Sequence, residues 1–273
     1  AGAPPRGGAR GGLAMTDSGV PVVELEGVRL HALREAECVE RVMALLSLRR
    51  GGWIASPNLD QLRLLARDPD LRRLYARADL VVADGMPLVW ACRLQRTPLP
   101  SRVAGSDLIW SLSAAAAARG FSAYLLGGDP GTAEEAAARL VAASPALRVA
   151  GTACPQPGFE RRDEAVAELC RRLVEAAPDL VYVALGAPKQ ELLIDRIRGA
   201  LPAAWWIGVG ASFTFVAGRV PRAPVWVRRL GLEWGHRLAH EPRRLARRYL
   251  VDDLPFGAGL LVRSAWRGLR GTT

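Results

Sequence analysis

The segment Ala78-Asp79-Leu80-Val81-Val82-Ala83-Asp84-Gly85 joins a short apolar run to a carboxylate and a glycine. The run from Leu80 to Ala83 is typical of a buried strand in a parallel sheet. Ligands of open α/β sheets bind outside the carboxyl ends of the strands, so Asp84 is placed where a carboxylate can do chemistry. Gly85 lets a substrate approach the backbone closely. The alternative, of equal weight here, is that Asp84 only caps a helix beginning near Pro87.

Outward from this segment, apolar strands alternate with amphipathic helices. Strands are predicted at 53–57, 80–83, 122–127, 147–151, 180–186 and 205–210, with a small β element within 20–30. Helices are predicted at 32–50, 58–67, 87–96, 106–119, 130–143, 162–177 and 188–199. Asn58 with Gln61 three residues on is a capping-box pattern for the second of these helices, and Ser106 or Asp107 is expected to cap the fourth. This alternation predicts an α/β fold, a Rossmann-like parallel sheet with helices on both faces. Beyond Gly218 the strand signal stops, and Pro242 and Pro255 divide a stretch that predicts short basic helices. Within it, Glu233-Trp234 is expected to pack the segment that carries His236 and His240.

Charge divides the chain unevenly. We expect a disordered N-terminal tail at 1–19, an α/β catalytic domain at 20–218 and a basic helical appendage at 219–273 that faces a membrane. The appendage holds twelve arginines against four acidic residues, whereas the whole chain has a formal net charge of +10. Such a segment predicts an anionic partner, either a phospholipid surface or a nucleic acid. Basic residues interleaved with aromatic ones or a recognised module would indicate nucleic acid, and neither appears, so we expect no nucleic-acid partner.

Further features bear on the membrane and the compartment. Leucines, Phe256 and Trp266 alternate with arginines near the end of the chain, a pattern typical of an interfacial helix. The longest apolar run, 203–218, has 16 residues, short of the roughly 20 that span a bilayer. Residues 1–12 lack the apolar region of a signal peptide, and Met15 is a candidate natural start. Four cysteines without metal-ligand spacing fit reduced thiols. We therefore expect a cytoplasmic protein, peripheral on the inner face of the cell membrane.

The stretch Gly127-Gly128-Asp129-Pro130-Gly131-Thr132 joins a predicted strand to a predicted helix and resembles a phosphate-binding loop. Its glycines open the backbone, and the helix N-terminus supplies N–H donors. A dinucleotide enzyme would carry an acidic residue about 20 residues later, at the end of the next strand. Val149 to Thr152 stands there without an acid, which argues against an NAD-dependent oxidoreductase. The sequence favours neither of the two interpretations of this stretch, a phosphate site or a tight strand-to-helix turn.

The stretch Gly186-Ala187-Pro188-Lys189-Gln190-Glu191 also opens a helix after a buried strand, with Pro188 in the first turn. Lys189 is the only lysine among 37 basic residues. A compact ammonium beside the Gln190 amide at a helix N-terminus suits a diphosphate or a uracil edge. We prefer this interpretation to a solvated first turn.

Two patterns formally suit a metal ion. Asp68-Pro69-Asp70 has the Asp-x-Asp spacing of metal-dependent sugar transferases, but it lies between two polar helices, so we interpret it as a surface turn. His236 and His240 stand at i, i+4 on a predicted helix, yet zinc needs a third ligand and His31 is far away in sequence. We therefore expect no metal site and no cofactor.

Taken together, the motifs resemble the WecG/TagA/CpsF family of bacterial glycosyltransferases, over about 20–249. They occur in the order Ser56-Pro57-Asn58, Ala83-Asp84-Gly85, Arg102 with Gly105-Ser106-Asp107, Leu125-Leu126-Gly127-Gly128, Pro188-Lys189-Gln190-Glu191, Gly208-Val209-Gly210 with Phe213, and Gly231-Leu232-Glu233-Trp234 followed by Arg237, Glu241-Pro242 and Arg243-Arg244. Because the motifs keep one order along most of the chain, the resemblance is more specific than any single motif.

The resemblance implies transfer of an N-acetylmannosamine-type sugar from a UDP donor to an undecaprenyl-diphosphate-linked N-acetylglucosamine, with inversion and without a metal. Asp84 then corresponds to the base, and Ser56 and Asn58 correspond to the family's Thr-x-Asn pocket. The predicted substrate-binding set is completed by Arg102, Gly127, Gly128, Lys189, Gln190 and Thr214. The predicted catalytic set adds the C-terminal arginines that fold over the donor diphosphate at the membrane, here Arg237, Arg244 and Arg247.

Two positions depart from the family pattern. Ser56 replaces the usual threonine and keeps the hydroxyl. Thr214 stands where many relatives carry an aspartate, which bears on the donor contact and on the sugar. The alternatives are a family member that uses another UDP-sugar in exopolysaccharide synthesis and a peripheral membrane-binding protein whose Rossmann-like body is only a scaffold. The polymer, teichoic acid or another cell-surface polysaccharide, stays open, as does the choice between a monomer and a homo-oligomer.

Overall fold

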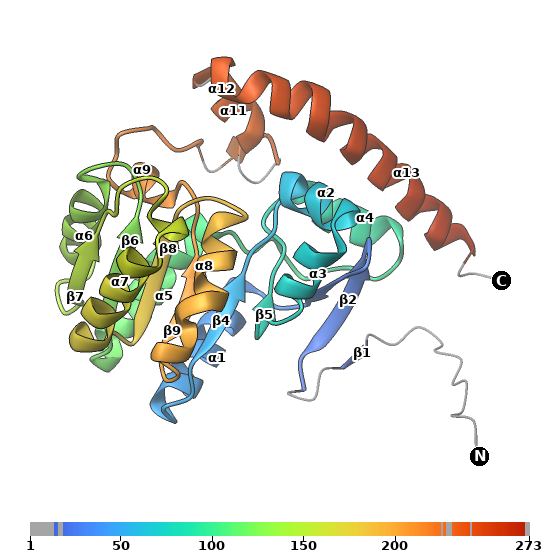
Figure 1. Ribbon diagram of the computed structural model, residues 1–273. Coiled ribbons are helices and arrows are strands. Elements are labelled where there is room, and N and C mark those ends of the chain that lie inside the picture. The colour runs from blue at the N-terminus through green and yellow to red at the C-terminus, as the bar shows by residue number, and fades with distance from the viewer. Residues whose placement is uncertain (1–13, 16–18, 225, 228–230, 241, 271–273) are drawn as a thin grey trace.

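A six-stranded parallel sheet forms the centre of the protein, with strand order β5-β4-β9-β8-β6-β7 (Figure 1). The computed structural model describes residues 14–15, 19–224, 226–227, 231–240 and 242–270. The strands are β4 (Gly52–Ala55), β5 (Leu80–Val81), β6 (Ser122–Gly127), β7 (Arg148–Ala153), β8 (Leu180–Ala184) and β9 (Trp205–Gly208). The predicted Rossmann-like α/β fold is confirmed.

Helices cover both faces of this sheet, because each contributes one apolar stripe to a separate half of the core. One half packs α1 (Glu35–Ser47), α5 (Gly105–Arg119), α6 (Thr132–Ala143) and α9 (Ser212–Val216). The other packs α2 (Leu59–Arg67), α3 (Pro69–Tyr75), α4 (Met86–Leu94), α7 (Asp163–Ala176) and α8 (Lys189–Ile197). Short 3-10 turns cover Phe159–Arg161 and Arg198–Ala200. Fully buried Trp53, Trp205 and Trp206 fill the sheet centre at β4 and β9.

The β element predicted near the N-terminus is an antiparallel sheet of β1 (Ala14–Met15), β2 (Pro21–Leu25) and β3 (Val28–His31). The His31 ring ties it to the central sheet, because Nδ1 accepts a hydrogen bond from the Val81 N–H at 2.9 Å. The prediction of a disordered tail at 1–19 is wrong for β1, whose two residues pair with β2. Residues 1–13 and 16–18 of that tail lie outside the described part of the chain.

The C-terminal segment is helical, but less divided than predicted. It comprises α11 (Glu233–His240), α12 (Pro242–Ala246), a π-helical segment η3 (Arg247–Asp253) and α13 (Leu254–Arg270). Short helices separated at Pro255 were expected, and this is wrong: Pro255 lies in the first turn of α13, which continues for 17 residues. Wider π-helical turns precede this proline, so the chain passes through it without breaking.

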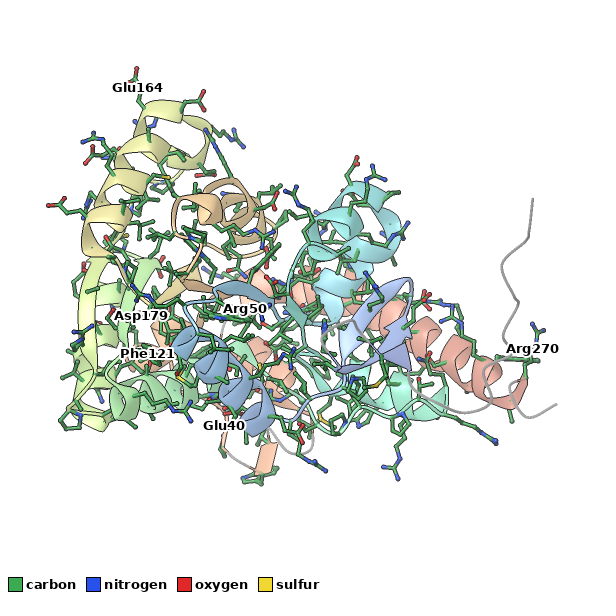
Figure 2. All side chains as sticks on the ribbon, turned by 90° about the horizontal axis from the view of Figure 1, so that it is seen from below. Glu40, Arg50, Phe121, Glu164, Asp179 and Arg270 are labelled. Carbon is green, nitrogen blue, oxygen red and sulfur yellow. The ribbon has the colours of Figure 1, made fainter. Side chains whose placement is uncertain are left out.

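The helix α13 lies across the body of the protein, over α2 and α4 (Figure 1). Its inner face carries small buried residues, Gly257, Ser264 and Gly268, beside Leu260, which let it approach α4 closely. Arg263 and Arg267 on α13 form ion pairs with Glu26 in the β2–β3 turn, at 3.2 and 3.1 Å. Figure 2 shows Arg270 at the tip of α13, at the opposite end of the molecule from Glu164 on α7. Within the described ranges, no helix has the length and apolar character needed to cross a bilayer.

Candidate active site

The loop that carries Asp84 is held at the carboxyl edge of the sheet by backbone hydrogen bonds on both sides. The Asp84 N–H donates to Pro57 O at 3.0 Å, and the Val103 N–H donates to Ala83 O at 2.9 Å. Gly85 has a φ of +149°, a backbone conformation that side chains disfavour, and α4 begins directly after it. No side chain caps α4, so the interpretation of Asp84 as a helix cap is wrong.

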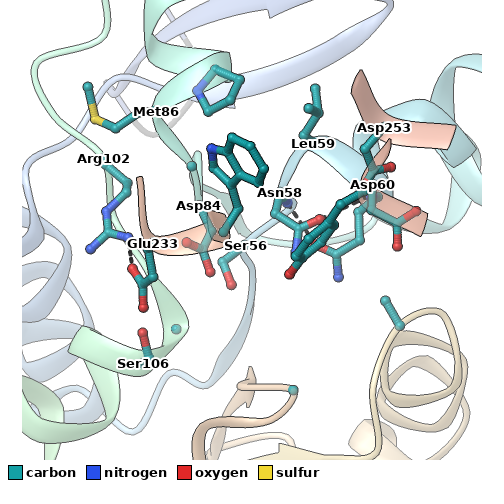
Figure 3. Close-up of a pocket in the computed structure, with 18 of the residues that line it drawn as sticks. Ser56, Asn58, Leu59, Asp60, Asp84, Met86, Arg102, Ser106, Glu233 and Asp253 are labelled. Atoms are coloured by element: carbon teal, nitrogen blue, oxygen red, sulfur yellow. Dashed lines mark hydrogen bonds and ion pairs between the residues drawn. The ribbon is translucent and has the colours of Figure 1, made fainter. Parts of the chain in front are cut away.

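A cavity of about 570 Å³ opens above this edge (Figure 3). Its walls come from the loops after β4, β5, β8 and β9 and from the C-terminal segment, which contributes Glu233, Trp234, Tyr249 and the start of α13. In Figure 3, Asp84 and Ser56 lie in the middle, with Arg102, Glu233 and Ser106 to one side and Asp60 and Asp253 to the other. The cavity is therefore shared between the parallel sheet and the segment beyond it.

Helix N-termini converge on this cavity. The first residues or caps of α2, α4, α5 and α8 all line it, through Asn58, Met86, Gly105 and Gln190. A helix N-terminus presents backbone N–H groups without partners inside the helix and a partial positive charge, which together favour an anion. At α2 one of these groups, the Gln61 N–H, is already taken by the Asn58 side chain. The parallel topology explains the convergence of α2, α4 and α8, since each follows a strand that ends at the same edge of the sheet, whereas α5 begins after the loop that leaves α4.

The carboxyl of Asp84 has a pKa raised to about 6, mainly because burial disfavours its charged form. Arg102 opposes that shift, whereas Glu233 and Asp107 add to it; the Gly105 N–H, which bonds to Asp84, lowers the pKa. A carboxylate with this pKa is ionised at neutral pH and is more basic than an ordinary aspartate. Asp84 therefore has the properties of a general base.

Arg102 lies beside Asp84 in a network of four charged side chains. Its Nη1 donates to Glu233 Oε2 and its Nη2 donates to Asp107 Oδ2, each at 2.8 Å. Arg222 pairs with the other oxygen of Asp107 at 2.8 Å and donates to Ser106 Oγ at 2.8 Å. All four charged side chains are less than a quarter exposed, so their interactions are only weakly screened by solvent.

Gln190 is fixed at both ends of its amide. Its Nε2 donates to Glu191 Oε1 at 2.8 Å, and its Oε1 accepts from the Gly210 N–H at 3.0 Å. Gly208 makes this possible, because a Cβ there would lie 2.7 Å from Gln190 Nε2. Glu191 is buried, and burial raises its pKa. The Gln190 amide is thus held in one orientation against the glycine-rich end of β9.

A second ionic cluster fastens the C-terminal segment to α2. Arg63 pairs with Asp60 at 2.6 Å and with Asp253 at 3.2 Å, while Arg248 approaches the same two carboxylates at 3.4 and 3.9 Å. Asp253 is nearly buried, and burial together with the nearby Asp60 raises its pKa to about 6. The η3 segment is therefore held beside the cavity by charge as well as by packing.

The sequence matches the model of the glycosyl transferase WecG/TagA/CpsF family over residues 23–270. The chain belongs to this family. It is a glycosyltransferase of cell-surface polysaccharide synthesis. Membership of the family implies, in general terms, a sugar-nucleotide donor and a lipid-linked acceptor. The match extends through α13, so the C-terminal segment that closes the cavity is part of the glycosyltransferase.

Five of the predicted site residues line the cavity of the glycosyltransferase: Ser56, Asn58, Asp84, Arg102 and Gln190. Asn58 also forms the predicted capping box of α2, since its Oδ1 accepts from the Gln61 N–H at 3.1 Å and its N–H donates to Gln61 Oε1 at 2.8 Å. Four of these residues come from the connections β4–α2, β5–α4 and β8–α8, and Arg102 comes from the loop between α4 and α5. Their roles toward substrate stay predictions.

Other predicted residues lie away from the lining of the cavity. Lys189 is largely exposed and approaches Glu160 at 3.6 Å. At Gly127 and Gly128 a Cβ would press on Ala184 and on Thr132, so these two glycines serve close packing of the loop. The Thr214 carbonyl accepts from the Arg219 N–H within the turn after α9. Substrate contacts by these residues remain predictions.

The structure describes the three predicted C-terminal arginines to different extents. Arg247 is exposed on η3, outside the residues that line the cavity. Arg237 belongs to α11 and Arg244 to α12, but their side chains lie outside what the structure describes. Their catalytic roles stay predictions.

Sequence reasoning missed several residues of the site. Glu233 was expected to pack its helix, and Asp107 or Ser106 was expected to cap α5; instead Glu233 and Asp107 bind Arg102, and α5 has no side-chain cap. The motif Gly231-Leu232-Glu233-Trp234 was the one available signal for Glu233. No pattern in the sequence indicated Arg222, because only the folded chain brings it to Asp107.

The two metal patterns have other roles where the structure describes them. Asp68 caps α3, accepting from the N–H groups of Asp70 and Leu71 at 2.9 and 3.0 Å, and Asp70 pairs with Arg73. His236 lies on α11, and the His240 side chain is outside the described set. Among the described residues, no group of three or more His, Cys, Asp or Glu side chains is arranged to hold a metal ion.

Proposed function

We propose that this glycosyltransferase moves an N-acetylmannosamine-type sugar from a UDP donor to an undecaprenyl-diphosphate-linked N-acetylglucosamine, with inversion and without a metal ion. The observation that carries the proposal is Asp84, a carboxylate with a raised pKa at the centre of a cavity surrounded by helix N-termini. The sugar and the acceptor come from the resemblance described above.

The reaction needs one proton acceptor. The acceptor hydroxyl attacks the anomeric carbon from the side opposite UDP while its proton passes to the Asp84 carboxylate. The bond between the anomeric carbon and the diphosphate oxygen breaks, and its electron pair leaves with UDP. A base with a pKa near 6 suits this step at neutral pH, because it is ionised and still takes a proton readily.

The leaving diphosphate needs positive charge. Arg102 and Arg248 are the described cations that line the cavity, and both are engaged by carboxylates. We therefore assign the diphosphate to the helix N-termini, assisted by Arg237 and Arg244 from α11 and α12. Gln190, fixed by its two hydrogen bonds, is assigned to the donor as a positioning group.

A lipid-linked acceptor places the enzyme at a bilayer. The outer side of η3 and α13 exposes large apolar side chains, namely Leu250, Val251, Leu254, Val262, Trp266 and Leu269. Inner-face residues of the same helix are packed on the body, so this stripe remains for an interface. We propose that it rests on the anionic inner leaflet of the cell membrane, next to the mouth of the cavity.

A donor screen with a short-chain lipid-diphosphate-N-acetylglucosamine acceptor tests the proposal. We expect turnover with UDP-N-acetylmannosamine, lost roughly 10²–10⁴-fold in Asp84→Asn while UDP still binds. Asp70→Asn is the matched control, since that exposed carboxylate should not affect turnover. Turnover only with another UDP-sugar would overturn the assigned donor. Near-normal turnover of Asp84→Asn would overturn the assigned base.

A further inference from the structure

Glu233 is the one carboxylate in the Arg102 network that comes from the C-terminal segment. Arg102 precedes α5, Asp107 lies on α5 and Arg222 follows α9, whereas Glu233 is the first residue of α11. Its Oε2 takes the hydrogen bond from Arg102 Nη1 at 2.8 Å, and its Oε1 lies 3.7 Å from Arg222 Nε. The docking of α11 therefore adds one negative charge between two arginines.

We propose that Glu233 is a positioning residue that prepares Asp84 for proton transfer: by engaging Arg102, it keeps that guanidinium from pairing closely with the Asp84 carboxylate. Through Glu233, the C-terminal segment takes part in setting the surroundings of the base. This inference rests on the proposed role of Asp84.

The geometry of Arg102 supports this role. Each of its two terminal nitrogens already donates to a carboxylate at 2.8 Å, one on Glu233 and one on Asp107. A guanidinium binds a carboxylate most strongly through two parallel N–H bonds from its fork. Because Nη1 donates to Glu233 and Nη2 donates to Asp107, Arg102 cannot offer these two nitrogens together to the Asp84 carboxylate. Without Glu233, Nη1 would have no partner from α11 and could turn to Asp84.

The charges around Asp84 agree with this account. The described groups that act on its carboxyl are Arg102, the α5 residues Gly105 and Asp107, and Glu233 of α11. Arg102 and the Gly105 N–H favour the ionised form, while Glu233 and Asp107 favour the protonated form. Removing either acid should therefore lower the pKa of Asp84, and removing Arg102 should raise it.

Carbon-13 NMR titration of aspartate-labelled full-length protein tests the inference, with Asp84→Asn used to assign the resonance. We expect Glu233→Gln and Asp107→Asn to move the Asp84 titration to lower pH by about one unit, and Arg102→Gln to move it to higher pH. Glu40→Gln, which removes an ion-paired glutamate on α1, is the matched control and should leave the titration unchanged. General loss of structure would not produce shifts of opposite sign.

The pH dependence of kcat/KM, measured with UDP-N-acetylmannosamine and the short-chain acceptor, should show the same displacement in its acidic limb. An unmoved Asp84 resonance in Glu233→Gln, or displacement of all three variants in one direction, would overturn the inference. Failure of the proposed function has a different signature, namely an Asp84→Asn variant that still turns over, and the NMR titration would still report on the network.

Discussion

Substituting glycines on α13 should show that this helix depends on close contact with α4. A Cβ at Gly268 would overlap the carbonyl oxygen of Leu94 and lie 3.2 and 3.4 Å from Leu94 C and Gln95 Cα. All three atoms are backbone, so only movement of the helix relieves the overlap. At Gly259 the nearest atom is the flexible end of Arg263, at 2.9 Å, which can move away. Gly268→Ala and Gly259→Ala therefore form a matched pair on one helix.

Both variants gain about 1 kcal/mol of helix propensity, because alanine loses less backbone entropy than glycine in a helix. In Gly268→Ala, overpacking also destabilises the docked helix by about 1–3 kcal/mol. The two variants should differ by that second quantity, with Gly259→Ala at least as stable as the unmodified protein. Since each 1.4 kcal/mol is a factor of ten, the protection of α13 amides should differ between them by roughly 5- to 150-fold.

Hydrogen exchange of the α13 amides is the direct measurement, because a terminal helix can detach from the body and unfold locally before the whole protein unfolds. Trypsin provides a second readout through cleavage after Arg263 and Arg267, which should be faster in Gly268→Ala. Equal protection and equal cleavage in the two variants would refute the argument that small residues on the inner face of α13 allow its contact with α4.

Two further predictions concern metal and membrane. Turnover should survive EDTA, because three of the four described carboxylates that line the cavity, Glu233, Asp60 and Asp253, are already engaged by Arg102 or Arg248. Full loss of turnover with rescue by Mg²⁺ or Mn²⁺ would contradict this and return attention to Asp68 and Asp70. Binding to vesicles that contain phosphatidylglycerol should weaken about tenfold in Trp266→Ser, as apolar surface is lost from the outer stripe of α13. Leu192→Ser, a similarly exposed residue on α8, should bind like the unmodified protein, and equal weakening of both variants would exclude the α13 stripe as the contact.

Local patterns in the sequence were sufficient for most of the fold. The apolar run at Leu80 predicted a strand, and Asn58 with Gln61 predicted the start of α2, because a strand's burial and a helix cap depend on neighbours close in the chain. The same order of strands and helices predicted which edge of the sheet holds Asp84, Ser56 and Gln190, since parallel strands all end there. The course of the C-terminal segment was predicted less well, because Pro255 was interpreted as a break although it fits the first turn of α13.

Only the tertiary structure decided which charged residues of the site pair with one another and which segment covers the cavity. Arg102 and Glu233 are 131 positions apart, and no periodicity links an arginine before α5 to a glutamate on α11. Likewise Arg63 and Asp253 are 190 positions apart, yet they join α2 to η3. Ion pairs depend on distance in space and on local burial, which the packing of whole elements sets. The amino-acid sequence by itself thus determined that a carboxylate stands at the end of β5, while the folded chain determined its pKa, because its charged neighbours arrive from distant segments.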